Sequence, residues 1–236
     1  MRVGSTLLLK NKKCYQSYNW SYFRPLGSLQ IAMDSLDEYE CDEVAIIRPV
    51  RDCDSLDLFS RDLDVLRELK AMTPISFGGG IRSREHLELL EGLPVERFVF
   101  SSAFIASNQT LVDSARRLFG KQAIQCLLPV KVDADTIYIY DSNKAQFLGL
   151  EEVDLTLINE LANEVVLYDT SNDGGHDSFD KSIIERLPLE KNKLVVTGGV
   201  GKSTIEWARR EGLASVLIEN KVLHNEYSIR GFKDGR

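Results

Sequence analysis

Two stretches of the chain combine a strand-like apolar run with glycines and a serine, a pattern able to hold an anion. One is LVVTGGVGKST, residues 194–204, and the other is ISFGGGIRS, residues 75–83. Glycines directly after a strand let backbone N–H groups approach a phosphate closely, and the positive N-terminus of the following helix favours the same ligand. We expect the donors to be Gly79, Gly80, Gly198 and Gly199. Tight turns between strand and helix would need the same glycines without any ligand, and this alternative stays open.

Gly-Lys-Ser at 201–203 also resembles the end of a nucleotide-binding P-loop. Such a loop reads G-x-x-x-x-G-K-[ST], which requires a glycine where this chain has Val196. A P-loop domain also needs a further strand with a magnesium-binding acid, and the remaining chain has room for about one strand and a short helix. We therefore predict substrate phosphate binding rather than nucleotide hydrolysis. Lys202 and Ser203 should fall in the first turn of the next helix.

Apolar runs typical of strands alternate with amphipathic segments along the chain. The expected strands are 5–9, 43–47, 74–77, 97–100, 123–128, 164–168, 193–197 and 214–218. The expected helices include 55–72, 83–92 and 110–120. Eight strands that alternate with helices imply parallel pairing with right-handed crossovers. The pattern predicts an α/β fold, a single (β/α)8 TIM barrel of residues 1–236, with functional loops at the C-terminal ends of the strands.

The two glycine stretches also belong to an internal repeat. Their apolar runs start at Ile75 and Val195, an offset of 120 residues (195 − 75), and a serine, a helical pattern and Glu-Gly-Leu follow in both. The offset is about half of the chain, so each copy corresponds to one of two half-barrels. The two phosphate sites would then lie opposite each other across the barrel mouth. Polar residues after the fourth and eighth strands could complete them: Ser101, Ser102, Asn220 and Lys221.

Composition excludes several classes of protein. The formal net charge of −7 argues against nucleic-acid binding, which needs a basic face. The four cysteines are scattered without C-x-x-C spacing, so they indicate neither a zinc site nor a disulfide framework. The opening MRVGSTLLLK has too short an apolar run for a signal peptide, and no segment approaches about 18 apolar residues. We expect a cytoplasmic protein with no metal, no cofactor, and no membrane or nucleic-acid partner.

With these residues in view, the chain resembles the histidine-biosynthesis family of (β/α)8 barrels, most closely the cyclase subunit of imidazole glycerol phosphate synthase. The motifs that carry the resemblance are GGGI at 78–81, DGG at 173–175 and TGGVGK at 197–202. The family binds a substrate with a phosphate at each end. The resemblance implies that one phosphate binds Gly79, Gly80, Ser101 and Ser102. It implies that the other binds Gly174, Gly198, Gly199, Asn220 and Lys221.

The chain departs from the family at the residues that do acid–base chemistry. The cyclase has aspartates at the ends of its first and fifth strands, whereas the matching residues here are Leu8 and Pro129. Neither side chain can transfer a proton. Arg48 stands where the family has a further aspartate after the second strand. Asp173 and Asp169 are the carboxylates left near the mouth, and Asp173 is the candidate general acid or base, unless it only caps its loop.

The opposite end of the barrel carries charges that match the family. In the cyclase, four charged residues at the N-terminal strand ends gate ammonia that arrives from a docked glutaminase. The matching residues here have the same signs: Arg2, Glu43, Arg97 and Glu164. Glu96 matches an acidic residue that docks the glutaminase. Ordinary solvated strand ends would also carry such charges, which is the alternative.

The resemblance therefore implies a cyclase-like synthase subunit, of lyase or amidotransferase type, that uses ammonia from a glutaminase partner on a phosphorylated substrate. LLLKN at 7–11 is similar to the first strand of family members associated with bacterial surface polysaccharides. One alternative is a non-catalytic barrel that only docks and activates a glutaminase. Others are the cyclase of histidine biosynthesis itself and its sister ribotide isomerase, and both would need the aspartates that this chain lacks.

Overall fold

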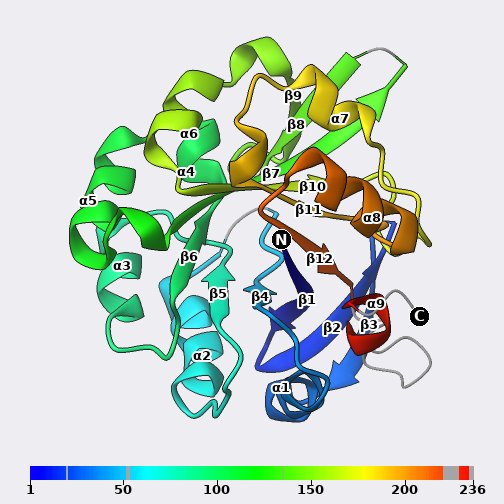
Figure 1. Cartoon of the computed structure of the whole chain (residues 1–236). Coiled ribbons are helices and arrows are strands. Elements are labelled where there is room, and N and C mark those ends of the chain that lie inside the picture. Colours follow the sequence, from blue (N-terminus) through cyan, green and yellow to red (C-terminus); the bar gives the residue numbers. More distant parts are fainter. Residues whose placement is uncertain (20, 52–53, 135, 220–228, 234–236) are drawn as a thin grey trace.

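A closed barrel of parallel strands forms the centre of the protein in the computed structural model, which describes residues 1–236 except 20, 52–53, 135, 220–228 and 234–236 (Figure 1). The eight barrel strands follow one another around the barrel in chain order. They are β1 (Arg2–Lys10), β4 (Val44–Ile47), β5 (Ile75–Gly78), β6 (Arg97–Phe100), β7 (Ile124–Asp133), β10 (Glu164–Asp169), β11 (Leu194–Thr197) and β12 (Ser215–Ile218). The barrel closes where β12 pairs in parallel with β1. The predicted (β/α)8 barrel is confirmed.

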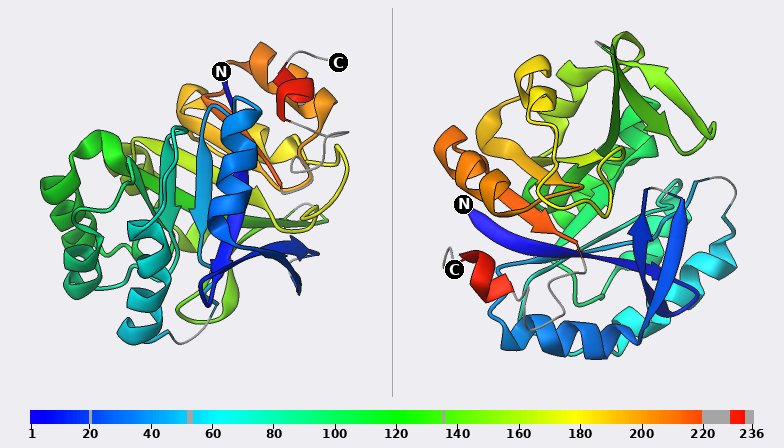
Figure 2. Two further views of the ribbon diagram at one scale, coloured as in Figure 1. Left: turned by 90° about the horizontal axis from the view of Figure 1, so that it is seen from below. Right: turned by 90° about the vertical axis from the view of Figure 1, so that its right-hand side faces the viewer.

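Helices surround the barrel and cover the outer face of its strands (Figures 1 and 2). They are α1 (Leu29–Glu38), α2 (Leu56–Arg67), α3 (Arg84–Leu90), α4 (Ser102–Ile105), α5 (Gln109–Phe119), α6 (Leu155–Leu161), α7 (Ser182–Arg186), α8 (Lys202–Glu211) and α9 (Ile229–Lys233). Short 3-10 turns span Lys121–Ala123, Leu150–Glu152 and Lys191–Lys193. The three predicted helices correspond to α2, α3 and α5. Among the described residues, no helix is both long and apolar enough to cross a lipid bilayer.

Helix α2 shows how the sequence produces these elements. The Ser55 hydroxyl accepts a hydrogen bond from a backbone N–H of the first turn and so caps the helix. Phe59, Leu63 and Leu66 lie at helical spacing on one face and are fully buried. Burial of each side chain of this size stabilises the fold by about 1.5–3 kcal/mol. Asp62 is buried on the same helix and forms an ion pair with Arg48. This pair lies next to the glycines that follow β5, which we call the first glycine loop; the glycines that follow β11 form the second glycine loop.

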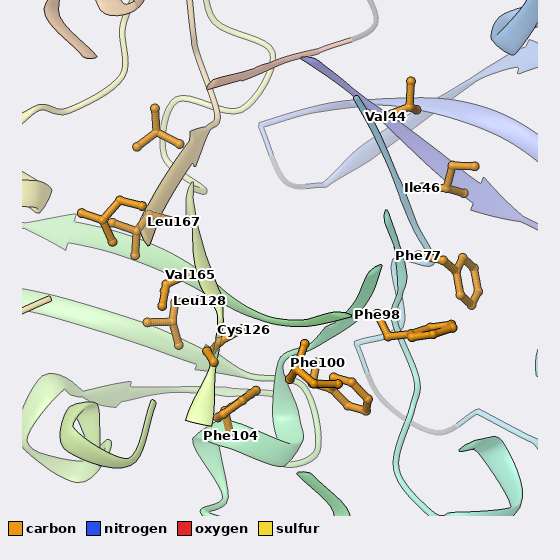
Figure 3. Close-up of a cluster of buried hydrophobic side chains, with 14 of the residues drawn as sticks. Val44, Ile46, Phe77, Phe98, Phe100, Phe104, Cys126, Leu128, Val165 and Leu167 are labelled. Carbon is orange, nitrogen blue, oxygen red and sulfur yellow. The ribbon is translucent and has the colours of Figure 1, made fainter. Parts of the chain in front are cut away.

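The main hydrophobic core lies between the barrel and the helices. Figure 3 shows part of it, where aromatic side chains of β5, β6 and α4 lie near aliphatic ones of β7 and β10. The labelled members include Phe77, Phe98, Phe100, Phe104, Leu128 and Leu167. A smaller cluster fills the barrel interior, and its members are Ala45, Val166, Val195 and Leu217. The barrel strands therefore bury both faces, as parallel strands do.

Two antiparallel extensions stand at the C-terminal end of the barrel. β1 continues into a hairpin formed with β2 (Lys13–Tyr18) and β3 (Tyr22–Gly27). β7 continues into a second one with β8 (Thr136–Asp141) and β9 (Gln146–Gly149). Figure 2 shows β2 and β3 (blue) standing on the barrel rim. Neither extension was predicted from the sequence.

Candidate functional site

The central pocket of the molecule lies at the C-terminal ends of the barrel strands. It holds about 580 Å³ of space, part of which is open to solvent. Its floor is the apolar barrel interior, with Ala45, Val166 and Leu217. Its polar lining residues are Thr6, Gln16, Ser17, Tyr168, Asp173, Thr197 and Glu219. An apolar hollow with a few polar groups is the usual form of a small-molecule site, and active sites of this fold lie at this end.

The first glycine loop forms a second pocket beside the central one. Gly79 and Gly80 follow β5 with φ of +101° and +85°, a backbone conformation that favours glycine. Ser101 and Ser102 line the same pocket. The Ser101 hydroxyl oxygen is buried and has no hydrogen-bond partner within the described part of the chain. Leaving such a group unpaired costs about 1–3 kcal/mol, so a ligand oxygen that accepts from it would be stabilised here.

Two arginines lie at the pocket of the first glycine loop. Arg51 lines the pocket, and its guanidinium lies 5.2 Å from the ring centre of Phe23. Burial lowers the pKa of Arg51, and the nearby Tyr168 opposes this shift. An arginine stays charged in a protein all the same. Arg82 donates to the carbonyl of Ser142, another residue of the pocket wall, at 3.3 Å. An anion is therefore the ligand that this pocket suits.

Arg48 lies beneath the first glycine loop and has a different environment. Its Nε is 2.9 Å from Asp62 Oδ2, and its Nη1 is 2.6 Å from Asp54 Oδ2. Nη1 also donates to the carbonyl of Gly79 at 3.2 Å. The guanidinium lies 4.9 Å from the ring centre of Phe59 on α2. Arg48 thus joins the glycine loop to α2, and the two carboxylates more than balance its single positive charge.

The second glycine loop, together with Gly174 in the loop after β10, binds a carboxylate of the protein itself. The N–H of Gly174 donates to Oε2 of Glu219 at 3.0 Å, and the N–H of Gly199 donates to Oε1 at 2.8 Å. Glu219 directly follows β12, the eighth barrel strand. Gly198 and Gly199 have φ of +93° and +73°, so the backbone turns as it does in the first loop. Two donors predicted for a second phosphate are therefore already in use.

Helix α8, which follows this loop, also has its N-terminus satisfied from within the chain. Asp177 accepts hydrogen bonds from the N–H of Ser203 at 2.9 Å and of Thr204 at 3.0 Å. The helix begins at Lys202, which confirms that Lys202 and Ser203 belong to its first turn. A carboxylate at this place interacts favourably with the helix dipole. The predicted phosphate ligands Asn220 and Lys221 lie outside the described residues.

Asp173 is buried at the edge of the central pocket. Its Oδ2 accepts from the Ser17 hydroxyl at 2.6 Å, and its carbonyl accepts from the N–H of Asn19 at 3.1 Å. The Tyr168 side chain is hydrogen-bonded to the same carboxylate. Burial, together with this carboxylate, raises the pKa of Tyr168 well above its usual value. Tyr168 therefore stays a hydroxyl donor, and Asp173 with Tyr168 is a pair able to accept and donate protons at the mouth.

Asp169, the other carboxylate near the mouth, organises the loop after β10. It accepts from the N–H of Ser171 at 3.1 Å, from the N–H and side-chain amide of Asn172 at 3.2 and 2.7 Å, and from the N–H of Asp180 at 2.9 Å. Burial raises the pKa of Asp169, and these hydrogen bonds oppose that rise. Its oxygens thus accept hydrogen bonds from the loop itself.

Leu8 and Pro129 lie at the mouth itself. Leu8 lines the central pocket, and Pro129 lines the pocket of the first glycine loop. The structure thus places hydrocarbon at both positions where the resemblance implied catalytic aspartates. Among the described residues that line the central pocket, Asp173, Tyr168 and Glu219 are the ionisable ones.

The four charged residues expected at the N-terminal strand ends are joined by ion pairs. Arg2 bridges two carboxylates, with Nε 3.1 Å from Glu43 and Nη2 2.6 Å from Glu164. Arg97 Nη1 lies 3.0 Å from Glu43 on the other side. The Glu43 and Glu164 side chains are only 3% and 10% exposed, whereas that of Arg2 is 32% exposed. Buried charges need such partners, which ordinary solvated strand ends do not.

Two uncharged residues complete what we call the basal ring: Arg2, Glu43, Arg97, Gln125, Glu164 and Ser215. The Gln125 amide donates to Glu164 Oε2 at 2.8 Å. The Ser215 hydroxyl donates to Glu43. Glu96 is exposed at the start of β6, on the same face of the barrel, beside a groove that includes the 88% exposed Met72.

Three residues of the mouth were missed from the sequence: Tyr168, Glu219 and Arg51. A positional signal existed for the first two. Tyr168 lies near the C-terminal end of β10, and Glu219 directly follows β12. In this fold, residues there face the mouth. Arg51 lies in an irregular segment, and strand periodicity carries no signal for it.

Comparison with known proteins agrees with this architecture. Residues 7–228 match the family model described as histidine biosynthesis protein. A putative imidazole glycerol phosphate synthase subunit hisF2 of Campylobacter jejuni is 25% identical over 207 residues, which is 85% of this chain and 80% of the relative. A protein of the same name from Vibrio vulnificus is 22% identical over 236 residues, 97% of this chain and 85% of the relative. The imidazole glycerol phosphate synthase subunit HisF of Alkaliphilus metalliredigens is 29% identical over 179 residues, 72% of this chain and 71% of the relative. The chain therefore belongs to the histidine biosynthesis protein family of (β/α)8 barrels and is similar to its HisF subunits.

Proposed function

We propose that this chain is a cyclase-like synthase subunit that passes ammonia from a glutaminase partner through its barrel to a phosphorylated substrate at the mouth. The observation that carries the proposal is the basal ring, a set of nearly buried ion pairs at the end of the barrel opposite to the substrate pockets. Burying charge is costly unless it is paired, and even a buried ion pair adds little to stability, so stability alone is a weak reason for the ring. In the proposal, the ring would cover the entrance to the apolar barrel interior.

The barrel interior between the ring and the mouth suits a small neutral molecule. It is lined by Ala45, Val166, Val195 and Leu217, and the hydroxyls of Thr6 and Thr197 lie 3.4 Å apart across it. Such surroundings disfavour ammonium, because burial disfavours the charged form of a base. Neutral ammonia carries no such penalty. Passage through the barrel would therefore deliver the nucleophilic form and keep it from bulk water.

Arg2 is the part of the ring best placed to act as the gate. Its side chain is the most exposed of the bridging groups, and it holds both Glu43 and Glu164. When Arg2 turns outward, Glu43 keeps its contact with Arg97 and Glu164 keeps that with Gln125. Opening by Arg2 alone would thus leave each carboxylate with a partner. A glutaminase that offers an acidic group to Arg2 could drive this movement.

At the mouth, Asp173 and Tyr168 would handle the protons of nitrogen transfer. Attack of ammonia on a carbonyl carbon forms a C–N bond, moves the C=O electron pair to oxygen and releases a proton from nitrogen. In the proposal, the Asp173 carboxylate would accept that proton and the Tyr168 hydroxyl would protonate the oxygen. Binding the substrate through its phosphate contributes chiefly proximity and orientation.

A second candidate function is a non-catalytic barrel that docks and activates a glutaminase. Leu8 and Pro129 at the mouth favour it, since both replace proton-transferring residues with hydrocarbon. It predicts an intact basal ring together with a mouth that performs no chemistry.

The test is to purify the chain with candidate glutaminases encoded beside it and to measure glutamate release, with and without phosphorylated ligands. We expect a complex in which the barrel stimulates release. The Arg2→Met variant should uncouple release from ligand, whereas Arg84→Met, at an 83% exposed arginine on α3, should not. Glutamine labelled with ¹⁵N in its amide separates the two candidates, because only a synthase transfers the label to its acceptor. Failure to form any complex would refute both.

A further inference from the structure

We infer that the substrate of this barrel carries a phosphate group at one end only. The phosphate binds at the first glycine loop, and the opposite end of the substrate presents hydroxyl or cationic groups to Glu219 and Asp173. The inference rests on the proposed function, since it names the substrate class of that same mouth.

Glu219 occupies two backbone donors predicted for a second phosphate, one in the second glycine loop and one in the loop after β10. Each carboxylate oxygen of Glu219 takes one backbone donor, Oε2 that of Gly174 and Oε1 that of Gly199. Two N–H groups that converge on one anion are how such a loop would hold a phosphate. The chain therefore supplies from its own eighth strand the negative charge that a second phosphate would supply.

The neighbouring anion-binding element is occupied in the same manner. Two N–H groups in the first turn of α8 donate to Asp177, so this helix N-terminus is satisfied. A phosphate at the second loop would have to displace Glu219 and would find the helix end already paired. Internal carboxylates thus replace an external anion at two adjoining positions.

Shape and charge on this side of the mouth also oppose a phosphate. Gly174 lies under the β2–β3 hairpin, so closely that a Cβ built on it would be 3.0 Å from the Tyr18 ring. Asp173 and Glu219 both line the central pocket here, and both carboxylates lie close enough to Tyr168 to raise its pKa. A phosphate dianion beside two carboxylates is repelled, whereas hydroxyl or ammonium groups would find acceptors.

The first glycine loop has the opposite character. Its pocket includes Arg51 and the buried Ser101 hydroxyl, which has no partner within the described part of the chain. The carboxylate of Asp54 near the loop is paired with Arg48. Arg51 also interacts electrostatically with Asp173, whereas Glu219 lies at the far end of the mouth with the second glycine loop. A single phosphate is therefore favoured at the first glycine loop, next to Arg51 and Ser101.

The test compares two probes that share a skeleton, fructose 6-phosphate and fructose 1,6-bisphosphate, by isothermal titration calorimetry with the full chain. We expect the wild-type protein to bind the bisphosphate no more tightly than the monophosphate. Glu219→Gln, which removes the charge and keeps the size, should raise the affinity for the bisphosphate at least tenfold over that for the monophosphate. Glu219→Ser provides the same test with a smaller side chain. Ser101→Asp should lower the affinity for both probes at least tenfold.

Glu190→Gln is the matched control, because it makes the same chemical change at an exposed residue just before β11, and it should alter neither affinity. A wild-type preference of tenfold or more for the bisphosphate would overturn the inference. So would undetectable binding of fructose 6-phosphate at millimolar concentration. If the chain bound the two probes as expected but stimulated no glutaminase, the proposed function would be refuted. The assignment of the two ends of the mouth would still stand.

Discussion

Replacement of Arg48 by methionine should be among the most damaging single changes outside the hydrophobic core. The Arg48 side chain is 4% exposed, and those of its partners Asp54 and Asp62 are 7% and 4% exposed. Methionine fills a similar volume and removes the charge. Two carboxylates would then remain buried without their cation, and the carbonyl of Gly79 would lose a donor.

The magnitude follows from the burial of all three groups. Removing one partner of a buried ion pair costs about 3–5 kcal/mol, because the other charge stays desolvated. For a chain of this length, about 1 kcal/mol corresponds to roughly 2–4 °C in Tm. We therefore expect Arg48→Met to lower Tm by about 6–20 °C.

The assay is thermal and urea unfolding followed by circular dichroism. Arg67→Met is the control, because Arg67 is 42% exposed and pairs with the 47% exposed Asp64, a kind of pair that contributes about 0–1 kcal/mol. A triple variant that combines Arg48→Met with Asp54→Asn and Asp62→Asn should recover a large part of the loss, since neutral amides need no cation. A Tm change no larger than that of the control, or a triple variant less stable than the single one, would contradict the argument.

Two further predictions concern a hydrogen-bonded carboxylate and the cysteines. Burial opposes ionisation of Asp37, but hydrogen bonds from the Thr73 hydroxyl and two backbone N–H groups prevail and lower the pKa of Asp37 below 3.8, so its stabilisation is present above about pH 4 and is lost as the pH falls. Asp37→Ala should therefore cost about 1–2 kcal/mol at pH 7, and the difference from wild type in urea unfolding should shrink towards pH 3; a difference independent of pH would count against this. Burial raises the pKa of both Cys14 and Cys41 to about 12 and raises that of Cys126 well above its usual value, so at pH 8 these three thiols should react with a thiol reagent only after unfolding. Rapid reaction of more than one thiol per native chain would show that this burial is wrong.

The barrel and its charged end could be predicted because both depend on local pattern. Eight apolar runs separated by amphipathic segments admit few topologies, and the first residues of the strands had to meet at one end. Arg2 and Glu164 are 162 positions apart in the chain, yet the strand order alone brings them to the same face. The glycine loops were found for a similar reason, since strand, glycine and helix follow one another directly in sequence.

The partners of the second glycine loop could not be predicted, because they depend on side-chain geometry across the barrel. Glu219 lies 20 residues from Gly199 and 45 from Gly174, and no spacing rule links a carboxylate to those two N–H groups. Arg48 was placed correctly after the second strand, but its orientation follows from Asp54 and Asp62, which the fold brings beneath it. The β2–β3 hairpin was not predicted, because its segment mixes polar and aromatic residues around Pro25, a residue that usually disfavours strands.

Closure of the barrel sets the order in which the molecule can be assembled during synthesis. Strand β1 pairs with β4 on one edge and with β12 on the other, where Arg2 aligns with Ser215. At about 5–20 residues per second, a ribosome would take roughly ten to forty seconds to reach that strand after making the first. Until then β1 has an open edge, and Glu43 lacks the hydroxyl of Ser215. The face with the basal ring is thus finished last, so a partner that recognises it would bind completed chains and pass over nascent ones.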